Sequence, residues 1–205
     1  MGTKIEKERK WLLKMPSEQQ PDEMIAMWQF YAGKRLRFQM QLDQTQKYGG
    51  FEGPDWIKHK IGLKQLFMAW QNIGNKYVLE VPSYGEWISN EKTKIAKGEF
   101  TETEELIQNL FEPLPPQITK AEFAISKLRH NYHYSNRKWE MDVMGDDLKL
   151  CFLEMEMDEK EDINDPQHIK EMPEHLRSLI VKEVTGDKLF SNRAISIKNP
   201  FYVKL

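Results

Sequence analysis

Five segments of this chain repeat one pattern, in which polar side chains at every second position alternate with other residues. The polar members are Glu6, Glu8 and Lys10; Arg35 and Arg37; Lys127, Arg129 and Asn131; Glu140 and Asp142; Glu154 and Glu156. Because side chains of a strand point alternately to opposite faces, each set shares one face. A solvated sheet surface explains any single strand, but five strands indicate charged faces that converge. A closed barrel with a polar interior satisfies the pattern and leaves no exposed edge.

Such an interior would hold six carboxylates and at least five cations. Crowded carboxylates repel one another unless they are protonated or bind a metal. Their hard oxygen atoms suit Mg²⁺ or Mn²⁺. Arginine binds phosphate oxygens through a rigid fork, and lysine acts as a point charge. The pattern therefore predicts a metal site next to a polyphosphate site.

Composition excludes several other classes of protein. The formal net charge of 205 residues is -2, so no basic excess indicates nucleic-acid binding. The single cysteine, Cys151, cannot form an internal disulfide and fits a reducing compartment. The first ten residues are too charged for a signal peptide, and no apolar run reaches the length of a membrane helix. We expect a cytoplasmic protein without a membrane partner, and a homodimer is left open.

The alternation varies in strength along the chain. Residues 3–14 and 24–31 fit either a strand or a helix, whereas residues 34–40 alternate cleanly and predict a strand. Three segments at 121–134, 138–143 and 149–157 alternate between turn-like residues. They predict a meander of antiparallel strands.

The remaining segments are less regular. Residues 41–75 carry several turn signals, and we interpret them as an insertion in one domain spanning residues 1–205. Strands are expected at 56–61 and 77–81, and a short helix at 63–70.

Helices are expected in three later segments. The first covers residues 101–111, because Thr101 and Glu104 form a capping-box pattern. Amphipathic spacing predicts a second helix over 173–184, and a short third one is expected over 188–195.

Taken in order, the motifs resemble those of the CYTH family, the triphosphate tunnel metalloenzymes. The matching segments are Glu6-x-Glu8-x-Lys10, Gln29-x-Tyr31, Arg35-x-Arg37, Lys127-x-Arg129, Trp139-Glu140-x-Asp142, Glu154-x-Glu156, Glu183-Val184-Thr185-Gly186-Asp187 and Phe190-Ser191-Asn192. Each match is weak alone, but their order and spacing are specific. They cover most of the chain except about residues 41–100.

The resemblance implies an α+β fold: a closed eight-stranded antiparallel β-barrel, the triphosphate tunnel, with flanking helices. It implies a bound Mg²⁺ or Mn²⁺ and a small molecule that contains a triphosphate. The metal ligands expected from the charged faces and the resemblance are Glu6, Glu8, Glu140, Asp142, Glu154 and Glu156. The phosphate-binding residues expected are Lys10, Arg35, Arg37, Lys60, Lys127 and Arg129, and the catalytic residues are Glu6, Glu8, Lys10 and Tyr31.

The chain departs from the family pattern in three places. Asn131 replaces a third basic group at the end of the K-x-R strand. The family's T-x-K strand is either the segment around Lys60 or residues 77–82, where Pro82 takes the place of the lysine. In the place of the R-x-E-x-E strand, only Glu91 fits.

Two further side chains have open roles. Tyr31 either assists water activation or packs in the core. His130 alternates with Arg129 and is expected in the wall rather than in the site.

The sequence supports three functions that share one tunnel. The first is metal-dependent hydrolysis of inorganic triphosphate, thiamine triphosphate or a nucleoside triphosphate. The second is a class IV-type adenylate cyclase that makes cyclic AMP from ATP. The third is a nucleotide- or polyphosphate-binding module without catalysis, which the departures in the middle strands motivate.

Overall fold

The computed structural model describes residues 4–32, 34–42, 47–48, 51–52, 85–107, 123–144 and 150–198. The elements expected at 56–61, 63–70 and 77–81 lie outside the described residues, as does Lys60. Most of the insertion expected at 41–75 lies outside them too, apart from short strands β4 (Lys47–Tyr48) and β5 (Phe51–Glu52), which pair with each other.

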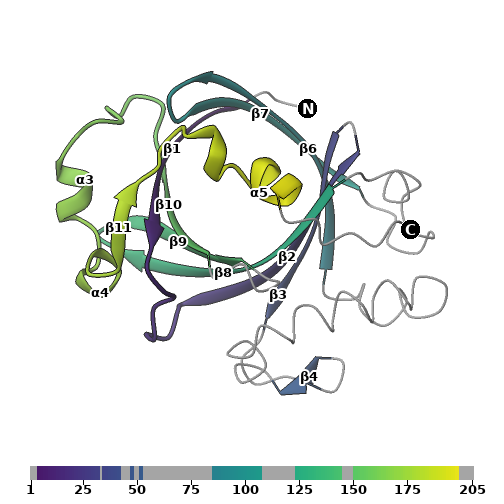
Figure 1. Cartoon of the computed structure of the whole chain (residues 1–205), viewed down its shortest axis with the longest axis horizontal. Coiled ribbons are helices and arrows are strands. Elements are labelled where there is room, and N and C mark those ends of the chain that lie inside the picture. Colours follow the sequence, from purple (N-terminus) through teal and green to yellow (C-terminus); the bar gives the residue numbers. More distant parts are fainter. Residues whose placement is uncertain are drawn as a thin grey trace.

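One antiparallel sheet contains all other described strands (Figure 1). Its members are β1 (Lys4–Leu13), β2 (Glu23–Ala32), β3 (Lys34–Leu42), β6 (Gly85–Ala96), β7 (Glu99–Ile107), β8 (Phe123–Tyr134), β9 (Arg137–Met144), β10 (Cys151–Met157) and β11 (Ile180–Glu183). Their order across the sheet is β10-β9-β8-β2-β3-β6-β7-β1-β11. The meander predicted from alternation is confirmed as β8, β9 and β10.

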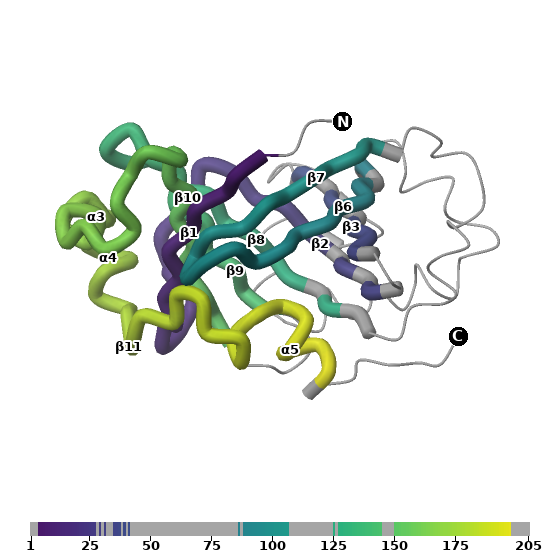
Figure 2. Tube along the Cα trace, turned by 90° about the horizontal axis from the view of Figure 1, so that it is seen from above, coloured from purple at the N-terminus to yellow at the C-terminus, as the bar shows by residue number. Residues whose placement is uncertain are grey.

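The sheet curls because β1 has neighbours from both halves of the chain. Its first residues pair with β7, from Lys4 opposite Glu102 to Lys7 opposite Glu99. Its later residues pair with β10, which stands at the far end of the strand order. Figures 1 and 2 show the strands curving around one interior. The predicted antiparallel, barrel-like sheet is confirmed at this level.

The larger apolar core lies outside the curl, on the face opposite the charged residues. It contains Trp11, Leu13, Tyr132, Trp139, Met141, Cys151, Leu153, Met155, Met157, Met172 and Leu176. The core residues of β1 and β10 have odd numbers, whereas the charged residues Lys10 and Glu154 on the same strands have even numbers and so lie on the opposite face. Alternation therefore separates an apolar outer face from a charged inner face, and segments after β10 cover the outer one. Cys151 is buried in this core.

The described helices are short. They are α3 (Gln167–Lys170), α4 (Glu174–Arg177), the 3₁₀ turn η3 (Lys188–Phe190) and α5 (Asn192–Lys198). The last two confirm the helical prediction for 188–195. Ile195 of α5 packs with Ile125 of β8 and Phe152 of β10, two residues of the inner face. Thus α5 lies against the inner face at one end of the sheet.

The helix prediction for 101–111 is wrong over its described residues, and the prediction for 173–184 is confirmed only for α4. Residues 101–107 belong to β7, which pairs with β6 on one side and with β1 on the other. Residues 180–183 form β11, in which Glu183 pairs with Trp11. Both segments pair with β1, which is distant in sequence, and β7 also pairs with the preceding strand β6. Pairing within the sheet therefore outweighs local helix propensity.

Gly98 allows the β6–β7 hairpin to lie against β1. Its φ of +68° belongs to the left-handed region, which glycine adopts without steric cost. Its carbonyl accepts a hydrogen bond from the Glu8 amide at 2.8 Å, and a Cβ atom at residue 98 would lie 2.6 Å from the Glu8 carbonyl oxygen. Only a residue without a side chain fits here, so Gly98 helps to fix the backbone at Glu8.

His130 is buried on the outer face of β8, as the alternation predicts. Neither ring nitrogen has a hydrogen-bond partner among the described residues. Burial lowers its pKa from 6.5 to about 4, although the Asp142 carboxylate acts in the opposite direction. The folded protein therefore keeps His130 neutral at pH values where the unfolded chain is protonated.

We expect acidification from pH 7 to 4 to cost about 3 kcal/mol of stability through His130. The unfolded chain binds the proton first as the pH falls through 6.5, so stability is lost across this interval. Urea unfolding of the parent and of His130→Leu at several pH values measures the difference. Parallel pH profiles for the two proteins would contradict this account.

Among the helices within the described ranges, none has the length and apolar character needed to cross a bilayer.

Candidate functional site

A cavity of about 790 Å³ occupies the interior of the curled sheet. Within the described part of the chain, ten basic and eight acidic side chains line it, contributed by eight strands and the start of α5. The basic residues are Lys4, Lys10, Arg35, Arg37, Lys92, Lys94, Lys127, Arg129, Lys138 and Arg193. Such a dense mixture of charge, with a small excess of cations, suits a highly charged anion together with a counter-ion.

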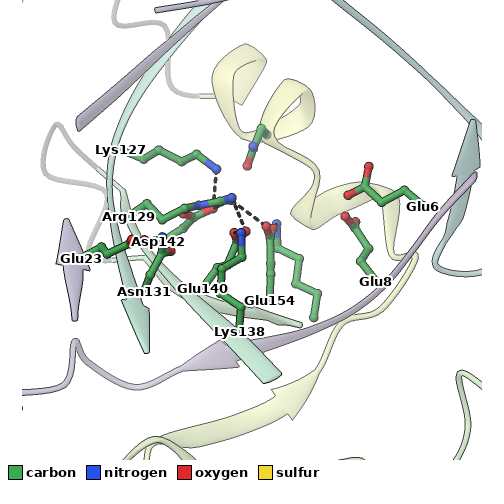
Figure 3. A network of polar contacts seen from close by, with 12 residues as sticks. Glu6, Glu8, Glu23, Lys127, Arg129, Asn131, Lys138, Glu140, Asp142 and Glu154 are labelled. Atoms are coloured by element: carbon green, nitrogen blue, oxygen red, sulfur yellow. Dashed lines mark hydrogen bonds and ion pairs between the residues drawn. The ribbon is translucent and has the colours of Figure 1, made fainter. Parts of the chain in front are cut away.

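Arg129 stands at the centre of a network from β8, β9 and β10 (Figure 3). Its guanidinium donates to Glu140, to Asp142 at 2.7 and 2.8 Å, and to Glu154 at 3.0 Å. The Lys127 ammonium also donates to Asp142. Burial opposes its charge, but the surrounding carboxylates raise the pKa of Arg129 further above its usual value. Burial and the Arg129 charge together lower the pKa of Lys127 to about 8.

Glu6 and Glu8 point into the interior from β1, across from this network (Figure 3). The Lys92 ammonium of β6 lies 3.0 Å from Glu6 Oε1 and 2.7 Å from Glu8 Oε2. Lys10, next on the same face of β1, lies 2.7 Å from Glu154 Oε1. The strand face predicted from Glu6-x-Glu8-x-Lys10 therefore lines the cavity, with each charge already paired.

Arg35 and Arg37 of β3 also face the cavity, and each meets a carboxylate of β7. Arg35 Nη2 lies 2.9 Å from Glu102, and Arg37 Nη2 lies 2.8 Å from Glu104. The Asn90 amide donates to both carboxylates. Both arginine Nε atoms are buried without a partner among the described residues, so each guanidinium keeps one donor in reserve.

Glu6 and Glu102 interact closely, with opposite consequences. Burial and a hydrogen bond with Glu102 raise the pKa of Glu6 to about 8. Burial also acts on Glu102, but hydrogen bonds from Glu6 and Asn90 lower its pKa to about 2. The two carboxyl groups thus share one proton at neutral pH, a proton that a bound cation can replace.

Tyr31 lines the cavity from β2, and its hydroxyl donates to Gln29 Oε1 at 3.4 Å. Burial raises its pKa to about 12, so the hydroxyl stays protonated at neutral pH. Asn192 of α5 donates to the same Gln29 oxygen at 3.0 Å. Tyr31 is therefore placed as a hydrogen-bond donor at the α5 end of the cavity rather than as a base.

The described structure brings most of the predicted site residues around one cavity. Those that line it are Glu6, Glu8, Lys10, Tyr31, Arg35, Arg37, Lys127, Arg129, Glu140, Glu154 and Glu156. Asp142 is fully buried and reaches the cavity through Lys127 and Arg129. Glu156 is exposed, and Lys60 lies outside the described residues. Glu140, Asp142 and Glu154, predicted as metal ligands, each bind a cationic side chain.

Lys92, Glu102, Glu104 and Asn90 were missed in the sequence. Their signal is the same two-residue period, in Asn90-x-Lys92 and in Glu102-x-Glu104. The alternation of Glu102 and Glu104 was not interpreted as a strand, because the capping-box pattern at Thr101 favoured a helix over 101–111. In chain order, these residues stand where the resemblance calls for the R-x-E-x-E strand.

The carboxylates fit a divalent cation in donor chemistry. Glu6 Oε2 is buried and has no hydrogen-bond partner among the described residues, and it lies beside two further carboxylates, those of Glu8 and Glu102. No three His, Cys, Asp or Glu side chains in the described ranges converge into a complete metal site. Mg²⁺ commonly uses only one or two carboxylates and takes its other ligands from phosphate and water. Glu6 and Glu8 meet that requirement.

Comparison with known proteins finds similarity in structure alone. No protein-family profile and no curated protein sequence matches the chain. Among the solved structures similar to it are the hypothetical protein NE1496, 18% identical over 94% of this chain and 97% of that chain, and the inorganic triphosphatase NE1496, 17% identical over 94% of both chains. The TM-score is 0.46 in each case.

Proposed function

We propose that this chain binds a triphosphate-containing small molecule inside the curled sheet and hydrolyses it with Mg²⁺ or Mn²⁺. The observation that carries the proposal is the convergence of five strand-borne cations on one cavity that also holds the paired carboxylates Glu6 and Glu8. The five are Lys10, Arg35, Arg37, Lys127 and Arg129. A chain of phosphates needs several cations at fixed spacing, which neighbouring strands supply.

Arg35 and Arg37 are suited to hold phosphate oxygens. They sit two residues apart on one strand face, and each has a buried Nε without a partner among the described residues. Their carboxylate partners, Glu102 and Glu104, keep the guanidinium groups oriented before an anion enters. Lys127 and Arg129 are held in the same way by Asp142. Charge-assisted hydrogen bonds from such pre-oriented donors stabilise charge that develops on the transferred phosphoryl group.

Glu6 and Glu8 would hold the divalent cation, and Glu102 lies close enough to Glu6 to share its proton. When bound, the cation supplies charge neutralisation and polarises a phosphoryl oxygen. Glu140, Asp142 and Glu154 serve instead to position Arg129, Lys127 and Lys10. Glu102 stays ionised at neutral pH and orients the Arg35 guanidinium toward the phosphate. Tyr31 would donate a hydrogen bond at the α5 end.

We propose further that the curled sheet closes into an eight-stranded barrel. Its support is the position of β1, which pairs with β7 through its first residues and with β10 through its later ones. Closure would shield the charges from bulk water and strengthen each interaction with the substrate.

The test is phosphate release from inorganic triphosphate, thiamine triphosphate and ATP in the presence of Mg²⁺ or Mn²⁺. Release from any of them that requires the metal supports hydrolysis. Cyclic AMP and pyrophosphate from ATP would instead indicate a cyclase. Thermal stabilisation by triphosphate without any turnover would indicate a binding module. The observation that favours this alternative is that seven of the basic residues lining the cavity already pair with carboxylates: Lys10, Arg35, Arg37, Lys92, Lys127, Arg129 and Lys138.

A further inference from the structure

The ammonium group of Lys92 occupies the place between the two glutamates that would hold a divalent cation. It lies 3.0 Å from Glu6 Oε1 and 2.7 Å from Glu8 Oε2. The same nitrogen stands 4.3 Å from the centre of the Phe100 ring, on the strand between Lys92 and the glutamates. Two carboxylates and an aromatic face therefore hold the ammonium from three sides.

A metal ion and this ammonium cannot share the pair. Both need the inward oxygens of Glu6 and Glu8, and two cations a few ångströms apart repel each other by several kcal/mol in a partly buried site. Half-buried Lys92 has a flexible four-carbon stem, so it can leave. Once displaced, the Lys92 ammonium needs another anionic partner. The other described carboxylates around the cavity mostly pair with cations already, so a bound anion is the partner that remains.

We propose that Lys92 is an internal counter-ion that occupies the site between Glu6 and Glu8 when no ligand is bound. When a phosphate group binds the Lys92 ammonium, Glu6 and Glu8 become free to bind a divalent cation. Lys92 thereby couples metal binding to polyphosphate binding. Because coupling is reciprocal, each ligand strengthens the other by the same factor. The inference rests on the proposed function in one respect, namely that Glu6 and Glu8 hold the metal.

The geometry gives a direct consequence for the protein without substrate. In the parent protein, Mn²⁺ must displace an ammonium that is paired with both Glu6 and Glu8. In Lys92→Met no ammonium lies between the Glu6 and Glu8 carboxyl groups, so Mn²⁺ has no like charge to displace there. We expect substrate-free Mn²⁺ to bind Lys92→Met at least tenfold more tightly than the parent, by removal of a like charge at close range.

The experiment is a calorimetric titration of Mn²⁺ alone into the parent, Lys92→Met and Lys92→Gln, each first checked for its melting temperature. The glutamine variant keeps a neutral donor beside the glutamates if methionine impairs folding. Lys94→Met is the matched control, because Lys94 lies on the same face of β6 but donates to the Gly186 carbonyl at 2.7 Å. Its Mn²⁺ affinity should change less than threefold.

Tighter Mn²⁺ binding in both Lys92 variants, with the Lys94 variant unchanged, supports the inference. Equal Mn²⁺ affinity in parent and folded Lys92 variants overturns it. An equal gain in Lys92→Met and Lys94→Met also overturns it, since the effect would then be one of overall charge. Turnover of triphosphates by the parent is assayed separately. That assay alone tests the proposed hydrolysis, and its result does not depend on the Lys92 titrations.

Discussion

Arg129→Met is expected to lower the free energy of unfolding by about 3–5 kcal/mol. Arg129 is buried and contacts three carboxylates, those of Glu140, Asp142 and Glu154. Methionine fills much of the same volume but leaves these negative charges facing one another without their common partner. Lys127 and Lys138 neutralise only part of the charge. The carboxyl groups will take up protons at higher pH, so the loss should shrink as the solution is acidified.

Urea unfolding at pH 7.5 and pH 5 measures the effect. Arg137→Met is the matched control, because Arg137 also pairs with two carboxylates, Glu161 and Glu171, but on the outside of the sheet. Ion pairs near the surface, such as these partly exposed ones, contribute about 1 kcal/mol or less. If the two variants lose equal stability, the interior network does not have the role given to it here. Loss of triphosphate binding is expected in Arg129→Met alone.

Glu8→Gln is expected to reduce metal-dependent phosphate release about a hundredfold and to raise the Mn²⁺ concentration needed for half-maximal rate. The substitution keeps the shape of the side chain and removes one of the two charges proposed to hold the cation. Stability should change little, because Glu8 is partly exposed and Lys92 keeps Glu6 as its partner. The loss therefore belongs to the reaction and not to folding.

Initial rates measured across a series of Mn²⁺ concentrations test this expectation. Glu99→Gln is the control. Glu99 lies on the neighbouring strand β7, and its carboxylate is 3.5 Å from the Lys7 ammonium. Neither residue lines the cavity. Glu99→Gln should hydrolyse triphosphate at the parent rate. A Glu8→Gln protein with normal rates and an unchanged Mn²⁺ requirement would remove Glu8 from the proposed metal site.

Several features of the site were predictable because strand alternation is a local property. The faces of β1, β3, β8, β9 and β10 follow from a period of two, and the structure turns their charged sides toward one cavity. The same period of two did not lead to a correct prediction for β7, whose residues 101–107 were predicted as part of a helix. Its Glu102 and Glu104 alternate correctly, but Thr101 and Glu104 also fit a helix start, and only pairing with β6 and β1 decides between the two.

The sequence by itself determined which side chains share a face, because that depends on the geometry of one strand. It thereby determined a charged inner surface backed by an apolar outer one. Only the tertiary structure decided which charge meets which, because register and strand order set the distances between side chains of different strands. It joined Lys92 to Glu6 and Glu8, and Arg129 to three carboxylates expected to bind metal. The face of a strand is local, whereas the partner of a charge is not.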